Sequence, residues 1–288
     1  WPGPQVEIAI PSLFLTGGDD FLTSPATMKK LEGDMKEGAA SSGSTSESDG
    51  SSVPWETVRY AKIGHGFSNW QSMDSYDERV DARSWHSLIS FLGGEFGQAD
   101  YGADDPPPGP EEKVEKVEYT MGPTPAEGWV AKPDGMKGGD DLLPAVIILG
   151  GWEPEVTTYE KQRATQVATD AGFIGFAAQI QTEVLTVEGA LPTSMVARVK
   201  SAVDHVKSME GVDPTRIAIV GYGRGGSEAL FYAMSDAIEG FDGVDEGVKA
   251  IASFHGDIAN VVKSGLAKSL MPSSDEAGSG WAGAPAGG

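Results

Sequence analysis

Cysteine is missing from all 288 residues of the chain. Its absence excludes disulfides, thiolate metal ligands and a thiol nucleophile, and it leaves the redox compartment undetermined. The histidines, aspartates and glutamates also form no cluster with metal-ligand spacing. We therefore expect no metal ion, and the leading interpretation given below needs no cofactor.

Positive charge is scarce, because 21 Lys and Arg stand against 43 Asp and Glu, for a net charge of −22. Such a chain is poorly suited to nucleic acid, whose phosphates attract basic proteins, and an anionic membrane surface would repel it. No apolar run approaches the ~20 residues of a spanning helix. The chain begins at Trp1 without a signal-peptide pattern, so we expect a processed or trimmed product, with organellar and secreted locations both open.

Glycine and proline are unevenly distributed along the chain. Residues 38–53 are rich in Gly, Ser and acidic residues and are expected to form a flexible insert. Residues 97–112 resemble a stiff Pro-rich linker, and residues 271–288 form a loose tail of similar composition. We expect a single domain over residues 1–270.

Between these tracts, apolar strands alternate with amphipathic helices, and 39% of all residues are hydrophobic, which suffices for a sizeable core. This pattern predicts an α/β fold with a mostly parallel central sheet and helices on both faces. The expected strands are 7–16, 57–63, 114–120, 128–132, 144–149, 173–178, 216–220 and 248–254, and the expected helices are 25–36, 77–92, 158–170, 194–209, 226–237 and 260–270.

The most informative segment is 216–234, in which an apolar strand, a glycine-rich turn and a helix follow one another. Its GYGRGG sequence fits the dinucleotide pattern G-x-G-x-x-G, in which backbone N–H groups hold a pyrophosphate. It also fits a nucleophile elbow, G-x-Nuc-x-G, with Gly223 at the nucleophile position. A tight turn without a ligand is the third interpretation.

The context disfavours the dinucleotide interpretation. That fold places an acidic residue about 20 residues further on, at the end of the next strand. Here the next predicted strand runs to Phe254, which is too late, and the intervening Asp242 and Asp245 fall in a Gly- and Asp-rich loop. A nucleotide cofactor therefore stays only as an alternative.

Acid and base candidates follow two other predicted strands. Asp19 and Asp20 come directly after an apolar strand, and His65 lies in a Gly-flanked loop after another. Taken alone, each is typical of an ordinary turn or helix cap. Together with an elbow-like turn, they favour the acid and histidine of a hydrolase.

Six motifs give the chain a resemblance to the dienelactone hydrolase family of α/β hydrolases: LFLTGGDDFLT, GHGFSN, YDERVDARSW, PAVIILGGW, IAIVGYGRGG and IASFHG. The family has the last three motifs first and the Asp and His motifs after them, whereas this chain has the reverse order. The resemblance therefore implies a circular permutation, with residues 97–112 joining the former ends. Permutation is tolerated where termini lie in surface loops.

The resemblance also implies roles for individual residues. Asp20 corresponds to the orienting acid, with Asp19 as the fallback, and His65 to the general base. The backbone N–H groups of Arg224 and of Trp152 or its neighbour Gly151 would form the oxyanion hole. The nucleophile position falls on Gly223, which has no reactive atom, and Ser227 lies one turn further on, inside the predicted helix.

Glycine suits the elbow because the nucleophile there holds a backbone strained by about 1–3 kcal/mol. Three interpretations follow. The first is a non-catalytic protein that binds an ester- or lactone-like small molecule or a protein partner. The second is a hydrolase of small esters or lactones that uses water activated by His65, or whose nucleophile was removed by engineering. The third is a nucleotide-binding protein.

The remaining candidates are weaker. His86 and His205 lie in amphipathic helices, so we expect them to be surface or packing residues, and His255 follows a strand, where we expect a structural role. The Arg224 side chain is expected to meet either an anionic ligand or, preferably, a surface carboxylate. Because of the implied permutation, we also expect strand 7–16 to pair beside strand 248–254.

Overall fold

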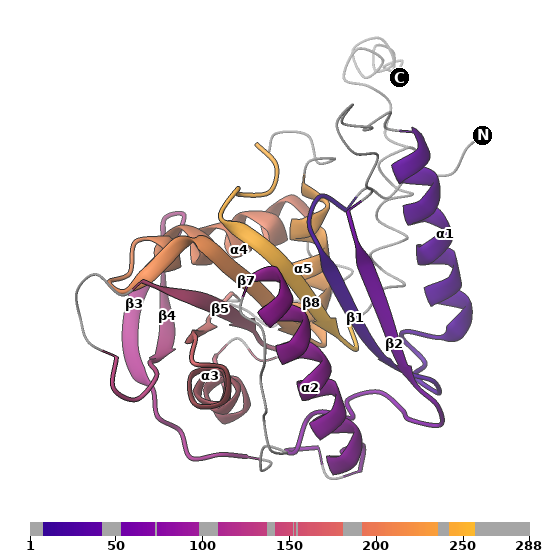
Figure 1. Cartoon of the computed structure of the whole chain (residues 1–288), viewed down its shortest axis with the longest axis horizontal. Coiled ribbons are helices and arrows are strands. Elements are labelled where there is room, and N and C mark those ends of the chain that lie inside the picture. Colours follow the sequence, from indigo (N-terminus) through magenta and orange to yellow (C-terminus); the bar gives the residue numbers. More distant parts are fainter. Residues whose placement is uncertain are drawn as a thin grey trace, which may run out of the picture.

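The computed structural model describes residues 8–41, 53–72, 74–97, 109–136, 142–151, 153, 155–180, 192–235 and 242–256. Within them, eight strands form one sheet in the order β2-β1-β8-β7-β5-β6-β4-β3 (Figure 1). The strands are β1 (Ser12–Gly17), β2 (Trp55–Tyr60), β3 (Glu115–Met121), β4 (Thr124–Ala131), β5 (Leu143–Leu149), β6 (Ile174–Ala178), β7 (Val212–Tyr222) and β8 (Val248–Phe254). Because β4 is antiparallel to both of its neighbours and the other pairs are parallel, the predicted mostly parallel sheet is confirmed.

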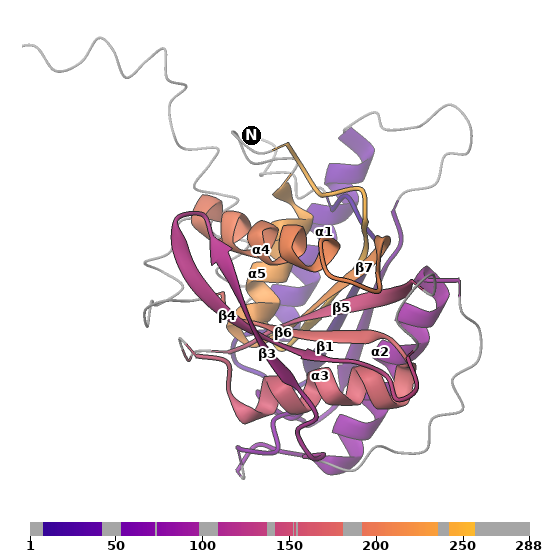
Figure 2. The same ribbon diagram turned by 90° about the vertical axis from the view of Figure 1, so that its left-hand side faces the viewer.

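Helices cover both faces of this sheet, as predicted (Figure 2). They are α1 (Pro25–Ser41), α2 (Glu78–Glu95), α3 (Thr158–Ala171), α4 (Pro192–Lys207) and α5 (Arg224–Ala233). Successive strand residues point to opposite faces. In β5, Ile147 therefore packs in the core with α1, α4 and α5, while Val146 packs with α2 and α3. An apolar strand buried on both sides needs this double cover.

The first strand of the chain lies beside the last described one. Strand β1 pairs in parallel with β8, with Ser12 opposite Ile251 and Leu15 opposite Phe254, and its other edge pairs with β2. The predicted pairing of these two segments is therefore confirmed. As a result, the carboxyl ends of β2, β1, β8 and β7 meet at one edge of the sheet.

Several predicted boundaries were wrong. The strand expected from residue 7 begins at Ser12, just after Pro11, whose ring leaves no N–H for a ladder. Helix α1 continues past the expected end to Ser41, into the tract expected to be flexible, because the alanines there favour a helix despite Gly38. The rest of that tract (42–52), most of the linker (98–108), helix 260–270 and tail 271–288 lie outside the described residues.

Candidate functional site at the carboxyl edge of the sheet

The glycine-rich turn between β7 and α5 forms a sharp bend. Gly223 holds φ 55° and ψ −120°, a conformation that side chains disfavour and glycine adopts readily. If a Cβ were added at this position, the nearest atom beyond the two chain neighbours would be the Gly151 Cα, 3.9 Å away. The turn thus has space for a side chain, and its backbone conformation is what favours glycine.

Asp20 and His65 meet where the adjacent parallel strands β1 and β2 end. The Asp20 Oδ2 lies 3.0 Å from the His65 Nδ1, while its Oδ1 accepts hydrogen bonds from the backbone N–H groups of Leu22 and Thr23 at 2.8 and 3.2 Å. Burial alone would raise the pKa of Asp20, but the hydrogen bond and charge of His65 and the Leu22 N–H hold that pKa below its usual value. Asp19 is exposed, so Asp20 is the residue brought to His65.

His65 and Gly223 line the same cavity, which has a volume of about 330 Å³. Because Asp20 occupies Nδ1, Nε2 is the His65 nitrogen left for a ligand or reacting group. Gly151 also lines this cavity, whereas Trp152, the other expected oxyanion donor, lies outside the described residues. The remaining lining residues are Gly66, Asn69, Gln71, Ser72, Ser75, Glu153, Thr157, Tyr159, Glu160, Tyr222 and His255.

His255, for which only a structural role was expected, is part of the cavity wall. Its Nε2 lies 3.0 Å from the Ser68 Oγ, and its ring centroid lies 5.0 Å from that of His65. Burial, with the nearby His65 charge, lowers the pKa of His255 to about 3, so its imidazole is neutral at physiological pH. Its place directly after β8, matching that of His65 after β2, is the signal that could have revealed it.

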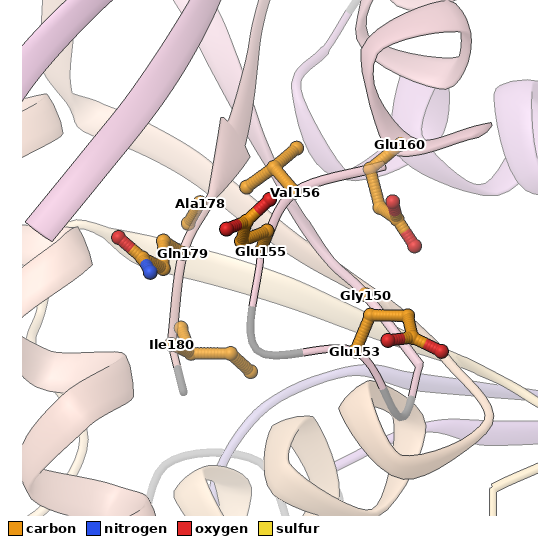
Figure 3. A pocket seen from close by; sticks show the side chains of 8 residues that line it. All are labelled: Gly150, Glu153, Glu155, Val156, Glu160, Ala178, Gln179 and Ile180. Atoms are coloured by element: carbon orange, nitrogen blue, oxygen red, sulfur yellow. The ribbon is translucent and has the colours of Figure 1, made fainter. Parts of the chain in front are cut away.

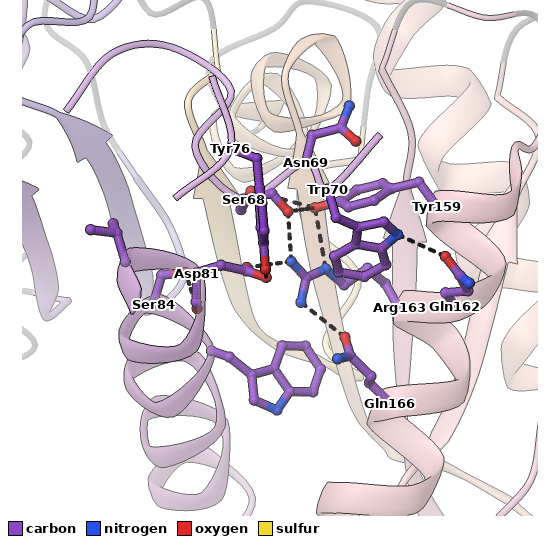
Figure 4. A network of polar contacts seen from close by, with 12 residues as sticks. Ser68, Asn69, Trp70, Tyr76, Asp81, Ser84, Tyr159, Gln162, Arg163 and Gln166 are labelled. Carbon is purple, nitrogen blue, oxygen red and sulfur yellow. Dashed lines mark hydrogen bonds and ion pairs between the residues drawn. The ribbon is translucent and has the colours of Figure 1, made fainter. Parts of the chain in front are cut away.

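Behind the cavity, the Arg163 side chain lies at the centre of a buried polar network (Figure 4). Its guanidinium pairs with Asp81, donates to the Ser68 carbonyl at 2.8 Å, and donates to the Tyr159 hydroxyl at 3.2 Å. It also lies over the Trp70 ring, 4.3 Å from the centroid. This network ties α2 and α3 to the loop that carries His65, and no sequence motif indicated it.

The Arg224 side chain was predicted to meet a surface carboxylate or an anionic ligand, and the preferred surface partner was wrong. Arg224 is fully buried, and its Nε donates to the Glu228 Oε1 at 3.1 Å, one turn along α5. Glu228 is buried too, and burial raises its pKa to about 7 against the opposing charges of Arg198 and Arg224. The i, i+4 spacing of these two residues on one helix was the available signal.

The other candidates agree with their expected roles. Ser227 lies inside α5, fully buried, so it does not reach the position of a nucleophile at residue 223. His205 of α4 stacks on Tyr119 with ring centroids 5.2 Å apart, which is the predicted packing role. His86 is half-buried on α2.

The N–H groups of the turn are largely engaged within the protein. Gly223 donates to the Phe254 carbonyl at 3.0 Å, Gly225 to the Gly150 carbonyl at 2.9 Å, and Gly226 to the Gly223 carbonyl at 3.0 Å. A Cβ at Gly225 would lie 2.4 Å from the Leu149 carbonyl oxygen, so this glycine allows the turn to approach β5 closely. The glycines therefore serve packing, and the geometry gives no support to a pyrophosphate cradle.

A second, much smaller cavity of about 10 Å³ lies next to Gly150 (Figure 3). Glu153, Glu155 and Glu160 line it, and Glu153 and Glu160 also line the larger cavity. Among the described residues, no three His, Asp or Glu side chains converge as metal ligands. No helix in the described segments is both long enough and apolar enough to cross a membrane.

A strand–turn–helix elbow, with an acid and a histidine at neighbouring strand ends, characterises this sheet. The fold is α/β-hydrolase-like. No family model and no curated protein matches the chain.

Solved structures give distant likenesses. A dienelactone hydrolase-like promiscuous phosphotriesterase from metagenomic libraries is 20% identical, with a TM-score of 0.40 over 50% of this chain and 59% of that one. A Pyrobaculum calidifontis esterase is 19% identical, with a TM-score of 0.37 over 58% of this chain and 50% of that one. A bacterial heroin esterase is 19% identical, with a TM-score of 0.35 over 58% of this chain and 50% of that one. The chain thus spans less than two thirds of each of these proteins.

Proposed function

We propose that this protein is a circularly permuted relative of the dienelactone hydrolases that binds a small ester- or lactone-like molecule without forming an acyl-enzyme. The observation that carries the proposal is a residue without a side chain, Gly223, at an otherwise intact elbow, lining one cavity with His65. Covalent ester hydrolysis needs a nucleophilic atom at that point, and glycine has none.

Sheet topology supports the proposed permutation. If the chain order is taken to start at β3, the strands follow as β3, β4, β5, β6, β7, β8, β1 and β2, and β1 and β2 then extend the sheet edge next to β8. That order places the elbow before the acid and the histidine, as the resemblance to the dienelactone hydrolases requires. Residues 97–112 are the segment that would then join the former ends.

Loss of the nucleophile has a physical rationale at this position. A non-glycine residue held at the φ of Gly223 costs about 1–3 kcal/mol, and an active hydrolase tolerates that cost for its chemistry. Once covalent chemistry is no longer needed, replacement by glycine stabilises the fold. The Asp20–His65 pair and the cavity are retained because both serve ligand binding.

The test combines turnover and binding. We expect the protein to hydrolyse small activated esters and lactones no faster than its His65→Ala variant, with no burst of acyl-enzyme. Saturation-transfer NMR should nevertheless detect binding of such compounds. Gly151→Phe, which adds a ring in the cavity where a Cβ meets no atom within 4 Å, should abolish the signal. A burst in the unmodified protein, or ligand binding unaffected by Gly151→Phe, would overturn the proposal.

A second candidate is hydrolysis by a water molecule that His65 activates. The specific observation in its favour is the intact 3.0 Å contact of Asp20 with His65 Nδ1, which leaves Nε2 to accept a proton from water. This mechanism predicts slow turnover without a burst. His65→Ala would then lower the rate, whereas simple binding predicts equal rates.

A further inference from the structure

The charge of the cavity wall points to one class of ligand. Glu153 and Glu160 both line the cavity, and no Lys or Arg lines it among the described residues. Arg163 lies behind the wall, but its charge is already paired with Asp81. The wall is therefore negative, and a carboxylate-bearing ligand would be repelled from it.

Glu160 is the unusual member of this wall because its side chain is only 5% exposed and has no cationic partner among the described residues. Its Oε2 closes the N-terminal capping box of α3 by accepting from the Thr157 N–H at 2.7 Å. Its Oε1 accepts no hydrogen bond within the described part of the chain. A Cβ on Gly150 would lie 2.7 Å from that oxygen, so glycine there leaves room for the carboxylate (Figure 3).

Two aromatic rings complete the environment. Tyr159 and Tyr222 line the same cavity, with their ring centroids 5.1 Å apart in an edge-to-face arrangement. The Arg163 guanidinium already lies over both rings, 5.2 and 5.5 Å from their centroids, so the rings add a neutral, largely apolar wall and not a free face for a second cation. The attraction for an ammonium group therefore comes from the two carboxylates that line the cavity.

We infer that the cavity takes a ligand carrying an organic ammonium group, and that the Glu160 carboxylate binds this group with help from Glu153. The inference rests on the proposed function, since it names the ligand class of the same cavity. An ester or lactone with an amine or trimethylammonium substituent has this chemistry. Binding would then give the Glu160 carboxylate the cationic partner that it lacks among the described residues.

The test uses three probes of similar size on the unmodified protein: the acetate ester of 2-(trimethylammonio)ethanol, its neutral isostere 3,3-dimethylbutyl acetate, and anionic 3-acetoxypropanoate. Dissociation constants are measured by calorimetry or NMR titration, so no catalytic activity is required. We expect the cation to bind at least tenfold more tightly than the neutral isostere. The anion should bind most weakly.

Glu160→Gln is the decisive variant because Gln also serves in a capping box, so the start of α3 is preserved. In this variant the cationic probe and its neutral isostere should bind with affinities within about threefold of each other, since only the charge of residue 160 is removed. Glu155→Gln is the matched control, because Glu155 is an exposed neighbour that lines the small cavity but not the large one. That variant removes the same net charge and should leave the ratio unchanged.

The possible outcomes separate this inference from the proposed function. Equal binding of the cation and the neutral isostere would overturn the ammonium inference and leave the binding cavity in place. The ammonium inference would also be overturned if the anion bound more tightly than the cation, or if Glu160→Gln kept the preference for the cation over the neutral isostere. If none of the three probes binds and other esters and lactones also fail to bind, the proposed function falls together with the inference.

Discussion

Two ion pairs lie near the cavity and differ in their exposure to water. The Asp20–His65 pair borders the cavity directly, whereas the Asp81–Arg163 pair contacts it through Tyr159. In the Asp20–His65 pair, the carboxylate is buried but 22% of the His65 side chain is exposed. In the Asp81–Arg163 pair, the exposed fractions are 7% and 1%. The first pair presents an imidazole ring to the cavity, whereas the second holds a permanent charge among rings and carbonyls. The comparison separates a pair suited to chemistry from a pair that supports the fold.

The largest effect is expected when the buried pair is broken. Arg163→Met leaves Asp81 buried without its counter-charge and removes the hydrogen bonds to Ser68 and Tyr159, so unfolding free energy should fall by about 3–5 kcal/mol. Urea denaturation measures this loss. Lys30→Met is the control, because it breaks the partly exposed Lys30–Asp34 pair and should cost less than about 1 kcal/mol. Similar losses in the two variants would refute the assigned supporting role.

A second buried pair, Arg224–Glu228, predicts a pH effect of intermediate size. Burial raises the pKa of Glu228 to about 7 from an ordinary 4.5, so the folded protein keeps a proton that the unfolded chain has lost. Stability from this group is full below about pH 4.5 and declines as the pH rises to about 7, by about 3 kcal/mol in total.

The measurement is the difference in unfolding free energy between the unmodified protein and Glu228→Gln at several pH values. We expect the variant to gain relative stability between pH 4.5 and 7 and the difference to become constant above that. Its absolute stability is not the readout, because Gln also leaves Arg198 and Arg224 without their shared carboxylate. A difference that does not vary with pH contradicts the raised pKa.

The smallest effect on stability is expected at the Asp20–His65 pair, whose histidine is partly exposed. Asp20→Asn keeps an oxygen for the Leu22 and Thr23 N–H groups but loses both the charge and the acceptor oxygen beside His65, so it should cost about 1 kcal/mol at neutral pH. Because the native pKa of Asp20 is lowered, this stability is present above its unfolded value and is lost as the pH falls through the native value. Urea denaturation of both proteins across the acid range measures this change, and a stability difference that does not vary with pH would contradict the lowered pKa of Asp20.

The sequence predicted more of the fold than of the site's surroundings. Strand 248–254 and the alternation of strands and helices follow from local apolar patterns, which is why they were predicted closely. Asp20 and His65 were found because both follow strands in motifs. Arg163 and Tyr159 were missed because their significance arises from contacts between distant segments, which no short motif records. Ser68 lies in the GHGFSN motif and Glu160 in a capping box, but neither motif indicates that the residue lies beside the cavity.

The surface partner expected for Arg224 was wrong for a related reason. In so acidic a chain, a surface carboxylate is the obvious partner for an arginine, yet helix α5 is buried on every side. Within the described residues, its carboxylate partner Glu228 lies one turn away on the same helix, and Arg198 of α4 approaches that carboxylate as well. Burial of a whole helix depends on which strands lie beneath it and which helices lie beside it, and local sequence does not specify this.

The central claim, that the site lacks a single side chain, is tested most directly by restoring it. Gly223→Cys places a thiol at the elbow, where a Cβ meets no atom closer than 3.9 Å, and His65 is present on the same cavity to accept its proton. The strained φ should lower the unfolding free energy by about 1–3 kcal/mol. We expect measurable hydrolysis of small activated esters and lactones by Gly223→Cys, and none above background by Gly223→Cys combined with His65→Ala. A folded Gly223→Cys protein that hydrolyses these compounds no faster than the parent would contradict the claim.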